Sequence, residues 1–290
     1  MPLVVDCDNT FGLPGHEIDD GLTLLALLSQ QAVEVAAITA TYGNGDVDEV
    51  VESTRRLLGL VDRNDIPVVR GARGPGDHGT DAASALIRLA DRYPGRLVVL
   101  AIGSMTNLHA AASADPEFFA KLGGVYAMGG YRGPLRFPRR DVEELNLSLD
   151  PAAAWCVLNA PCPVTLMTAQ TCLGARYGIR HLLANLAAPR WLRQTVASWF
   201  RRFSFGFGSV GFYLWDLVPA VAILDPRWFA DNPVRCTSSV TDLSRGRIIT
   251  AVVADPDPRQ AGIVNMPPGI RSSRRFASAA QQLWLQTARG

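Results

Sequence analysis

Short, continuously apolar segments alternate with segments of helical periodicity as far as residue 169. The apolar segments predict strands at 3–8, 33–43, 66–71, 96–103, 124–130 and 163–169. The segments between them predict helices at 19–30, 46–61, 82–93 and 106–122. Apolar strands that alternate with helices are typical of a parallel sheet with helices on both of its faces. The sequence therefore predicts an α/β fold with a mostly parallel central sheet.

The alternation becomes less regular after Arg176. Residues 247–255 and 261–266 predict a small antiparallel hairpin near the C-terminus, and residues 276–286 predict a closing helix. Because no linker or change in composition separates these parts, we expect one domain over residues 1–290.

Charge and cysteine usage exclude several classes of protein. The net charge is +1 and the basic residues are dispersed, which argues against a nucleic-acid or anionic-membrane surface. The five cysteines show no Cys-x-x-Cys spacing and are typical of buried thiols in a reducing compartment. With no signal peptide and no apolar run long enough to span a bilayer, the expected location is the cytoplasm.

Carboxylates gather where the first predicted strand ends. Asp6 and Asp8 end that strand, and Asp19 and Asp20 open the helix that follows. Other polar clusters, at 41–44, 103–107 and 128–130, follow later strands, and ligands of parallel sheets bind at this edge. Hard divalent cations prefer such oxygen ligands, so the pattern predicts a metal site there.

One alternative is a haloacid-dehalogenase-like phosphatase, whose Asp-x-Asp-x-Thr motif fits the segment Asp6-Cys7-Asp8-Asn9-Thr10. Such an enzyme also needs a lysine and a later carboxylate pair for magnesium. The single lysine, Lys121, lies in the tail of a predicted helix. The only Gly-Asp-x-x-x-Asp string, at 76–81, precedes that lysine, which is the wrong order. The metal interpretation is therefore favoured.

The chain resembles the inosine–uridine-preferring nucleoside hydrolase family, which opens with Asp-x-Asp-Pro-Gly-x-Asp-Asp. Asp6-Cys7-Asp8 and Asp19-Asp20 are similar to the two ends of that motif, with a longer loop between them. Similar segments follow in the family's order at 38–44, 100–108, 125–130, 144–154, 214–224 and 244–253. The resemblance implies a nucleoside-hydrolase-like, Rossmann-related fold and hydrolysis of ribonucleosides at the N-glycosidic bond, which releases the nucleobase and ribose.

The resemblance also implies roles for individual residues. It implies Ca²⁺ bound by Asp8, Asp20, Asp216 and the backbone carbonyl of Thr106, with Asp8 as the general base for water. It implies that the ribose hydroxyls are bound by Asp19, Asn44, Glu144, Asn146 and Asp216, and that Asp6 orders the carboxylates from behind. The implied partners are a nucleoside and further copies of the chain, in a homodimer or homotetramer.

Two features depart from the family. Trp215 stands where many members have a histidine, and indole cannot deliver a proton at neutral pH. We expect Trp215 to bind the nucleobase by stacking, and Met128 to line the pocket floor. The longer loop at 9–18 adds His16 and Glu17, which we expect to be solvated. These departures leave open a non-catalytic relative that binds ribose or nucleosides.

Overall fold

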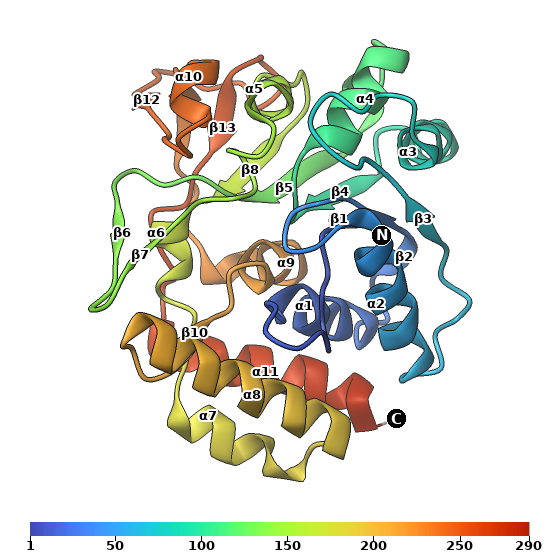
Figure 1. Ribbon diagram of the computed structural model, residues 1–290. Coiled ribbons are helices and arrows are strands. Elements are labelled where there is room, and N and C mark those ends of the chain that lie inside the picture. Colours follow the sequence, from blue (N-terminus) through green and yellow to red (C-terminus); the bar gives the residue numbers. More distant parts are fainter. Residues whose placement is uncertain (290) are drawn as a thin grey trace.

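Nine strands form the central sheet of the computed structural model, which describes residues 1–289 (Figure 1). Their order across the sheet is β12-β11-β13-β8-β5-β4-β1-β2-β3. Every pair from β13 to β3 is parallel, as the sequence predicts. The strands are β1 Pro2–Cys7, β2 Glu34–Ala40, β3 Val68–Arg70, β4 Val98–Ala101, β5 Gly124–Met128, β8 Val164–Met167, β11 Pro233–Cys236, β12 Thr250–Ala251 and β13 Ile263–Asn265.

Helices cover both faces of this sheet (Figure 1). On one face lie α3 (Asp81–Arg92), α4 (Thr106–Ala114) and α5 (Pro151–Leu158). On the other lie α1 (Asp19–Leu28), α9 (Leu217–Leu224) and α11 (Ser273–Arg289), with α8 (Arg190–Phe207) packed outside them. In β1, Leu3 and Val5 join the core under α1, and Val4 joins the core under α4. Both faces are thus buried, which explains the continuously apolar strands.

The remaining elements are short, apart from α2 (Val47–Gly59), whose first turn is capped by the side chain of Asp46. Two small antiparallel pairs stand apart from the main sheet: β6 (Leu135–Arg136) with β7 (Asp141–Val142), and β9 (Arg176–Tyr177) with β10 (Phe212–Tyr213). The short helices are α6 (Ala169–Cys172), α7 (Ile179–Ala184) and α10 (Val240–Leu243). Each helix among residues 1–289 is too short or too polar to cross a bilayer.

The helix predicted over 106–122 is shorter in the structure. Helix α4 ends at Ala114, and Asp115 is extended, with φ −134° and ψ 100°. Pro116 follows directly, and the residue before a proline is restricted to extended conformations. A separate 3₁₀ turn, Phe119–Lys121, then leads into β5.

The antiparallel structure predicted near the C-terminus is present, but its strands pair differently. Residues 247–255 and 261–266 were expected to pair with each other. Instead β11 lies between β12 and β13 and is antiparallel to both. On its other side β13 joins β8 in parallel, which extends the main sheet.

The strand order reverses beside β1. The chain proceeds from β1 to β2 and β3 on one side, and from β4 to β5 and β8 on the other. In open parallel sheets, ligands bind at the carboxyl ends of the strands where this reversal occurs. Asp8 follows β1 and Thr106 begins the helix after β4, so both lie at that point.

Candidate active site

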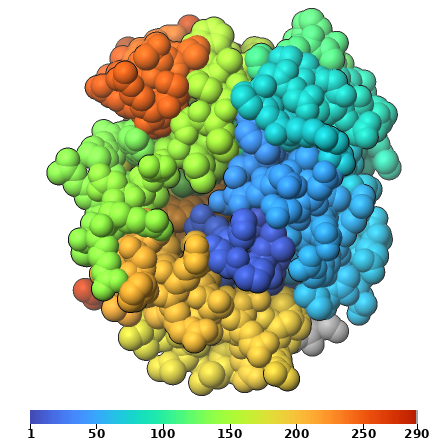
Figure 2. Space-filling view, viewed as in Figure 1, coloured from blue at the N-terminus to red at the C-terminus, as the bar shows by residue number. Residues whose placement is uncertain are grey.

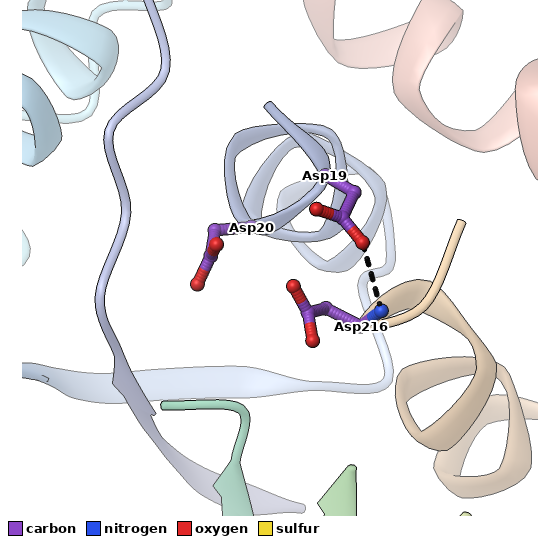
Figure 3. A group of neighbouring side chains, drawn as sticks. All are labelled: Asp19, Asp20 and Asp216. Carbon is purple, nitrogen blue, oxygen red and sulfur yellow. Dashed lines mark hydrogen bonds between the residues drawn. The ribbon is translucent and has the colours of Figure 1, made fainter. Parts of the chain in front are cut away.

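Carboxylates from three segments meet at the reversal point. Asp19 and Asp20 form the first turn of α1, and Asp216 directly precedes α9. One oxygen of each carboxylate lies within 4.8 Å of the others (Figure 3). The backbone N–H of Asp216 donates a hydrogen bond to Oδ2 of Asp19, 3.1 Å away. The three side chains are nearly inaccessible to solvent, Asp216 being 5% exposed and the other two 0%.

Asp8 lies beside this group and is also buried. Its Oδ2 accepts a hydrogen bond from the backbone N–H of Asn44, 2.7 Å away. A Cβ atom on Gly43 would lie 2.0 Å from the same oxygen. Only glycine therefore allows the backbone at position 43 to lie so close to the Asp8 carboxylate. The tight group therefore contains Asp19 in addition to the predicted ligands Asp20 and Asp216. The predicted ligand Asp8 stands next to it.

Burial makes these carboxylates reluctant to ionise. Burial raises the pKa of Asp8 to about 7 and that of Asp19 to about 6. The pKa values of Asp20 and Asp216 are raised well above the usual range, by burial and then by the charges of neighbouring aspartates. Among residues 1–289, every ion pair of a lysine or arginine is formed with a carboxylate outside this group.

Several carboxylate oxygens of this group and of Asp8 have no hydrogen-bond partner although they are buried. They are Oδ1 of Asp8, Oδ1 of Asp19 and both oxygens of Asp20. Buried polar atoms are normally paired, and a buried carboxylate without a counter-charge is strongly unfavourable. Anionic oxygens that converge in this way fit a hard divalent cation, which would supply the missing charge and bonds.

Asp6 is held by two side chains at the end of β1. Its Oδ1 accepts hydrogen bonds from Thr39 Oγ1, at 2.5 Å, and from Asn107 Nδ2, at 2.8 Å. Asn107 also donates to the carbonyl of Ala40 and accepts from the N–H of Ala72. Asp6 thereby connects β1 with β2 and α4, and it is fully buried.

Thr106 is fully buried at the first position of α4. Its hydroxyl donates to Oδ2 of Asp150, 2.9 Å away, while Oδ1 of Asp150 caps the first turn of α5. This pair fixes the starts of the two helices relative to each other. The side chain of Thr106 thus has a structural role, which leaves only its carbonyl for the ligand role implied by the resemblance.

A pocket opens beside the carboxylates, with about 520 Å³ of empty space. Figure 2 shows the hollow where the green, gold and dark-blue segments meet. Six of the predicted substrate-binding residues line it, namely Asn44, Met128, Glu144, Asn146, Trp215 and Asp216. Asp19, the seventh, is buried and does not line the pocket. The other lining residues are Glu17, Ile102, Tyr131, Leu135, Val142, Glu143, Leu145 and Ala169.

The lining polar side chains are held by backbone groups. Nδ2 of Asn146 donates to the carbonyls of Met128, at 3.1 Å, and Ile102, at 3.3 Å. The carboxylate of Glu144 accepts hydrogen bonds from the backbone N–H groups of Gly130, Leu147 and Ser148. Burial raises the pKa of Glu144, and these three hydrogen bonds oppose that shift. Both residues are therefore fixed at the ends of β4 and β5.

Glu17 was expected to be solvated, and this expectation was wrong. It is only partly exposed, and it lines the pocket beside the side chain of Trp215. Burial, and then the charges of Asp19 and Asp8, raise its pKa well above the usual range. Its position two residues before Asp19 was the only sequence signal. His16 is half-buried, with Nδ1 2.8 Å from the carbonyl of Asn44.

The aromatic segment before Asp216 contributes one ring to the pocket. Trp215 is 7% exposed and lines the pocket, and its ring centroid lies 5.0 Å from that of Tyr213. Phe207 and Phe212 are buried in the core, whereas Phe205 is 77% exposed and outside the pocket. Stacking on a planar ligand is thus a possibility for Trp215 alone among these residues.

The phosphatase interpretation lacks its lysine. Lys121, the single lysine of the sequence, forms ion pairs with Asp91 and Asp115, each at 2.7 Å. It precedes the amino end of β5, whereas the carboxylates lie at the carboxyl edge of the sheet. No lysine is therefore available to neutralise a phosphoryl group at Asp6.

Comparison with known proteins agrees with this geometry. Residues 3–267 match the sequence profile of a family described as inosine-uridine preferring nucleoside hydrolase. Two relatives, from Salmonella arizonae and Klebsiella pneumoniae, are named pyrimidine-specific ribonucleoside hydrolase RihA. Each is 28% identical over 193 residues, which cover 57% of this chain and 59% of the relative. The match thus spans less than two thirds of the length of these relatives.

Two solved structures are similar over nearly their whole length. A purine-preferring ribonucleoside hydrolase from Gardnerella vaginalis has a TM-score of 0.84 at 20% identity, covering 100% of both chains. A plant nucleoside hydrolase, PpNRh1, has a TM-score of 0.82 at 21% identity, covering 98% of both chains. At these identities the likeness establishes the fold.

Proposed function

Since the chain belongs to the inosine-uridine preferring nucleoside hydrolase family, we propose that it hydrolyses the N-glycosidic bond of ribonucleosides. The products are the free nucleobase and ribose. The observation that carries this proposal is the set of buried carboxylates, Asp8, Asp19, Asp20 and Asp216, beside a pocket lined by amides and one large aromatic ring.

We propose Ca²⁺ as the cation, held by Asp8, Asp20, Asp216 and the carbonyl of Thr106. Four buried oxygens without partners support a cation with many oxygen ligands. Calcium takes six to eight oxygens and accepts several carboxylates, whereas magnesium keeps several waters and uses one or two carboxylates. When bound, such a cation orients a water molecule and makes it more acidic.

Asp8 is the proposed general base. Its Oδ2 is fixed by the N–H of Asn44, whereas its Oδ1 has no partner. Oδ1 is therefore the atom that accepts the proton from the attacking water. A positioned carboxylate of this kind contributes about 10²–10⁴-fold to a rate.

The remaining polar groups are proposed to hold the ribose. Cleavage of an N-glycosidic bond proceeds through an oxocarbenium-like sugar, which nearby carboxylates stabilise electrostatically. The pocket is lined by Asn44, Glu144, Asn146 and Asp216. Asp19 lies outside the pocket lining, and its carboxylate accepts a hydrogen bond from the backbone N–H of Asp216. Since the amide N–H groups of Asn146 are held by backbone carbonyls, its Oδ1 is the atom available to a ribose hydroxyl. Trp215 and Met128 are proposed to contact the nucleobase.

The experiment that tests this function is product analysis with a panel of purine and pyrimidine ribonucleosides in calcium buffer. We expect base and ribose in equal amounts from at least one of them. Binding of a nucleoside without release of ribose would favour the non-catalytic relative. The two departures from the family, the long loop at 9–18 and Trp215, are the features that suggest this alternative. Release of phosphate from a nucleotide would favour the phosphatase.

We further propose that the chain is a single domain that works in the cytoplasm as a homodimer or homotetramer. The five cysteines are all free, which agrees with a reducing compartment. The side chains of Ile179, Leu183 and Leu186 are more than half exposed on neighbouring turns of α7 and the segment after it. Light scattering of the purified protein measures the number of subunits directly.

A further inference from the structure

The loop between β1 and α1 brings the carboxylate of Glu17 into the pocket, in addition to those of Glu143, Glu144 and Asp216. This loop is fixed by several contacts. Phe11 and Ile18 are buried in the core, and the ring of Phe11 packs edge-on against Trp191, with centroids 6.0 Å apart. The hydroxyl of Thr10 donates to the carbonyl of Glu17, 3.1 Å away. The direction of the Glu17 side chain is thus set by the packing of the loop.

Glu17 is linked to the largest flat surface of the pocket. The Trp215 side chain has a single donor, the indole N–H, and the Glu17 carboxylate lies beside this side chain in the pocket lining. A carboxylate has about four lone-pair sites, so most of its accepting capacity remains free. Glu17 and Trp215 therefore form a unit with an apolar face and a polar edge.

Three of the other polar side chains of the pocket are engaged elsewhere, and Asn44 is a proposed ribose ligand. Glu144 and Asn146 are tied to the backbone at the ends of β4 and β5, and Asp216 belongs to the carboxylate group. Glu143 lines the pocket but is exposed to solvent. If ribose lies at the carboxylates, the base meets the apolar wall of Trp215, Leu135 and Val142. Glu17 is a carboxylate that lines the pocket together with that wall.

We propose that Glu17 determines specificity by accepting a hydrogen bond from a ring N–H of the nucleobase, whose face packs on Trp215. This inference rests on the proposed function, since it assumes a nucleoside in the pocket. The ligand class is a base with a ring N–H on its outer edge, such as N3–H of uracil or N1–H of hypoxanthine. A base without that donor leaves the partly buried acceptor unpaired, and sites of this kind reject such analogues strongly.

The test measures dissociation constants by calorimetry for two matched pairs: uridine with 3-methyluridine, and inosine with 1-methylinosine. The wild type should bind at least one unmethylated nucleoside about tenfold or more tightly than its methylated partner. Glu17→Gln keeps both size and an acceptor, so it should retain this preference to within about threefold. Glu17→Met keeps the size but has no strong acceptor, so its preference should fall to about threefold or less.

The matched control is Glu143→Met, which changes a lining carboxylate that is exposed. Its preference should equal that of the wild type. The inference is overturned if Glu17→Met keeps the full preference, because discrimination would then be steric. It is also overturned if Glu17→Gln loses as much as Glu17→Met.

Failure of this inference can be told apart from failure of the proposed function. Binding preferences that depend on Glu17, without any release of ribose, would support the inference and contradict hydrolysis. Ribose release with a preference that is unchanged in Glu17→Met would support hydrolysis and contradict the inference. Circular dichroism of each variant confirms that the loop substitutions leave the fold intact.

Discussion

The backbone N–H of Asp216 donates to the carboxylate of Asp19 across 3.1 Å, although the two residues are 197 positions apart in the sequence (Figure 3). This bond fixes the start of α9 against the first turn of α1. The carboxylates are therefore brought together by the protein itself, at a cost in electrostatic repulsion. A bound cation would turn that repulsion into attraction.

Replacement of Asp20 by asparagine should have opposite effects with and without calcium. Both oxygens of Asp20 are buried without partners, so the loss of one charge relieves repulsion in the cation-free protein. We expect Asp20→Asn to unfold about 2–4 °C above the wild type in chelator. In calcium the variant should unfold at a lower temperature than the wild type, because it has lost one carboxylate ligand of the cation.

Scanning calorimetry in both buffers measures the unfolding temperatures of Asp20→Asn and the wild type. Glu117→Gln, which changes an exposed carboxylate on the surface, serves as the control and should show neither effect. The same shift in both buffers for Asp20→Asn would contradict a cation at this group.

Removal of the Asp6 side chain should destabilise the protein. Asp6→Ala leaves the hydroxyl of Thr39 and an N–H of Asn107 without their acceptor in a dry environment. We expect the free energy of unfolding to fall by about 2–3 kcal/mol, compared with about 1 kcal/mol for Thr39→Val. Urea unfolding monitored by circular dichroism measures both, and an Asp6→Ala loss smaller than that of Thr39→Val would contradict the supporting role of Asp6.

Acid should weaken the packing around His181. Burial, and then the nearby Arg180 charge, lower the pKa of His181 from 6.5 to about 4. The neutral ring accepts a hydrogen bond from the N–H of Gly178, 2.9 Å away, through Nδ1. Because the folded state favours the neutral ring, this stabilisation is complete above pH 6.5 and is lost as the pH falls toward 4.

Between pH 7 and pH 4.5 the wild type should therefore lose about 2–3 kcal/mol more stability than His181→Asn, which does not titrate. Urea unfolding at a series of pH values measures the difference. Parallel pH profiles for the two proteins would show that His181 keeps an ordinary pKa.

Asn146 should affect turnover without affecting the cation. Its Nδ2 is held by the carbonyls of Met128 and Ile102, and its Oδ1 is free to contact substrate. We expect Asn146→Ala to lower kcat/KM for the preferred nucleoside about tenfold or more. The calcium dissociation constant, measured by calorimetry, should stay within about twofold of the wild type. Weakened calcium binding would instead place Asn146 among the groups that support the cation.

Much of the fold and part of the site could be predicted because they follow from local patterns. Apolar strands that alternate with helices indicate a parallel sheet, and the edge of such a sheet determines where Asp8 and Asn44 must lie. The resemblance added Asp216, whose partners are distant in the sequence.

Other features depend on long-range packing that no local pattern encodes. Glu17 faces the pocket because Phe11 packs on Trp191, 180 residues away, and because the hydroxyl of Thr10 holds the carbonyl of Glu17. The strand β11 is short and exposed at Pro233, so it carries little of the apolar signal that marks a strand. Its place between β12 and β13 is marked by backbone pairing with both strands.

The most direct test of the central claim is release of reducing sugar from the preferred ribonucleoside, with calcium or chelator, by the wild type and by Asp8→Ala. The account predicts release by the wild type in calcium, loss of release in chelator with recovery when calcium is restored, and release by Asp8→Ala reduced at least about 100-fold. Release that persists in chelator, or that Asp8→Ala carries out at the wild-type rate, would contradict it.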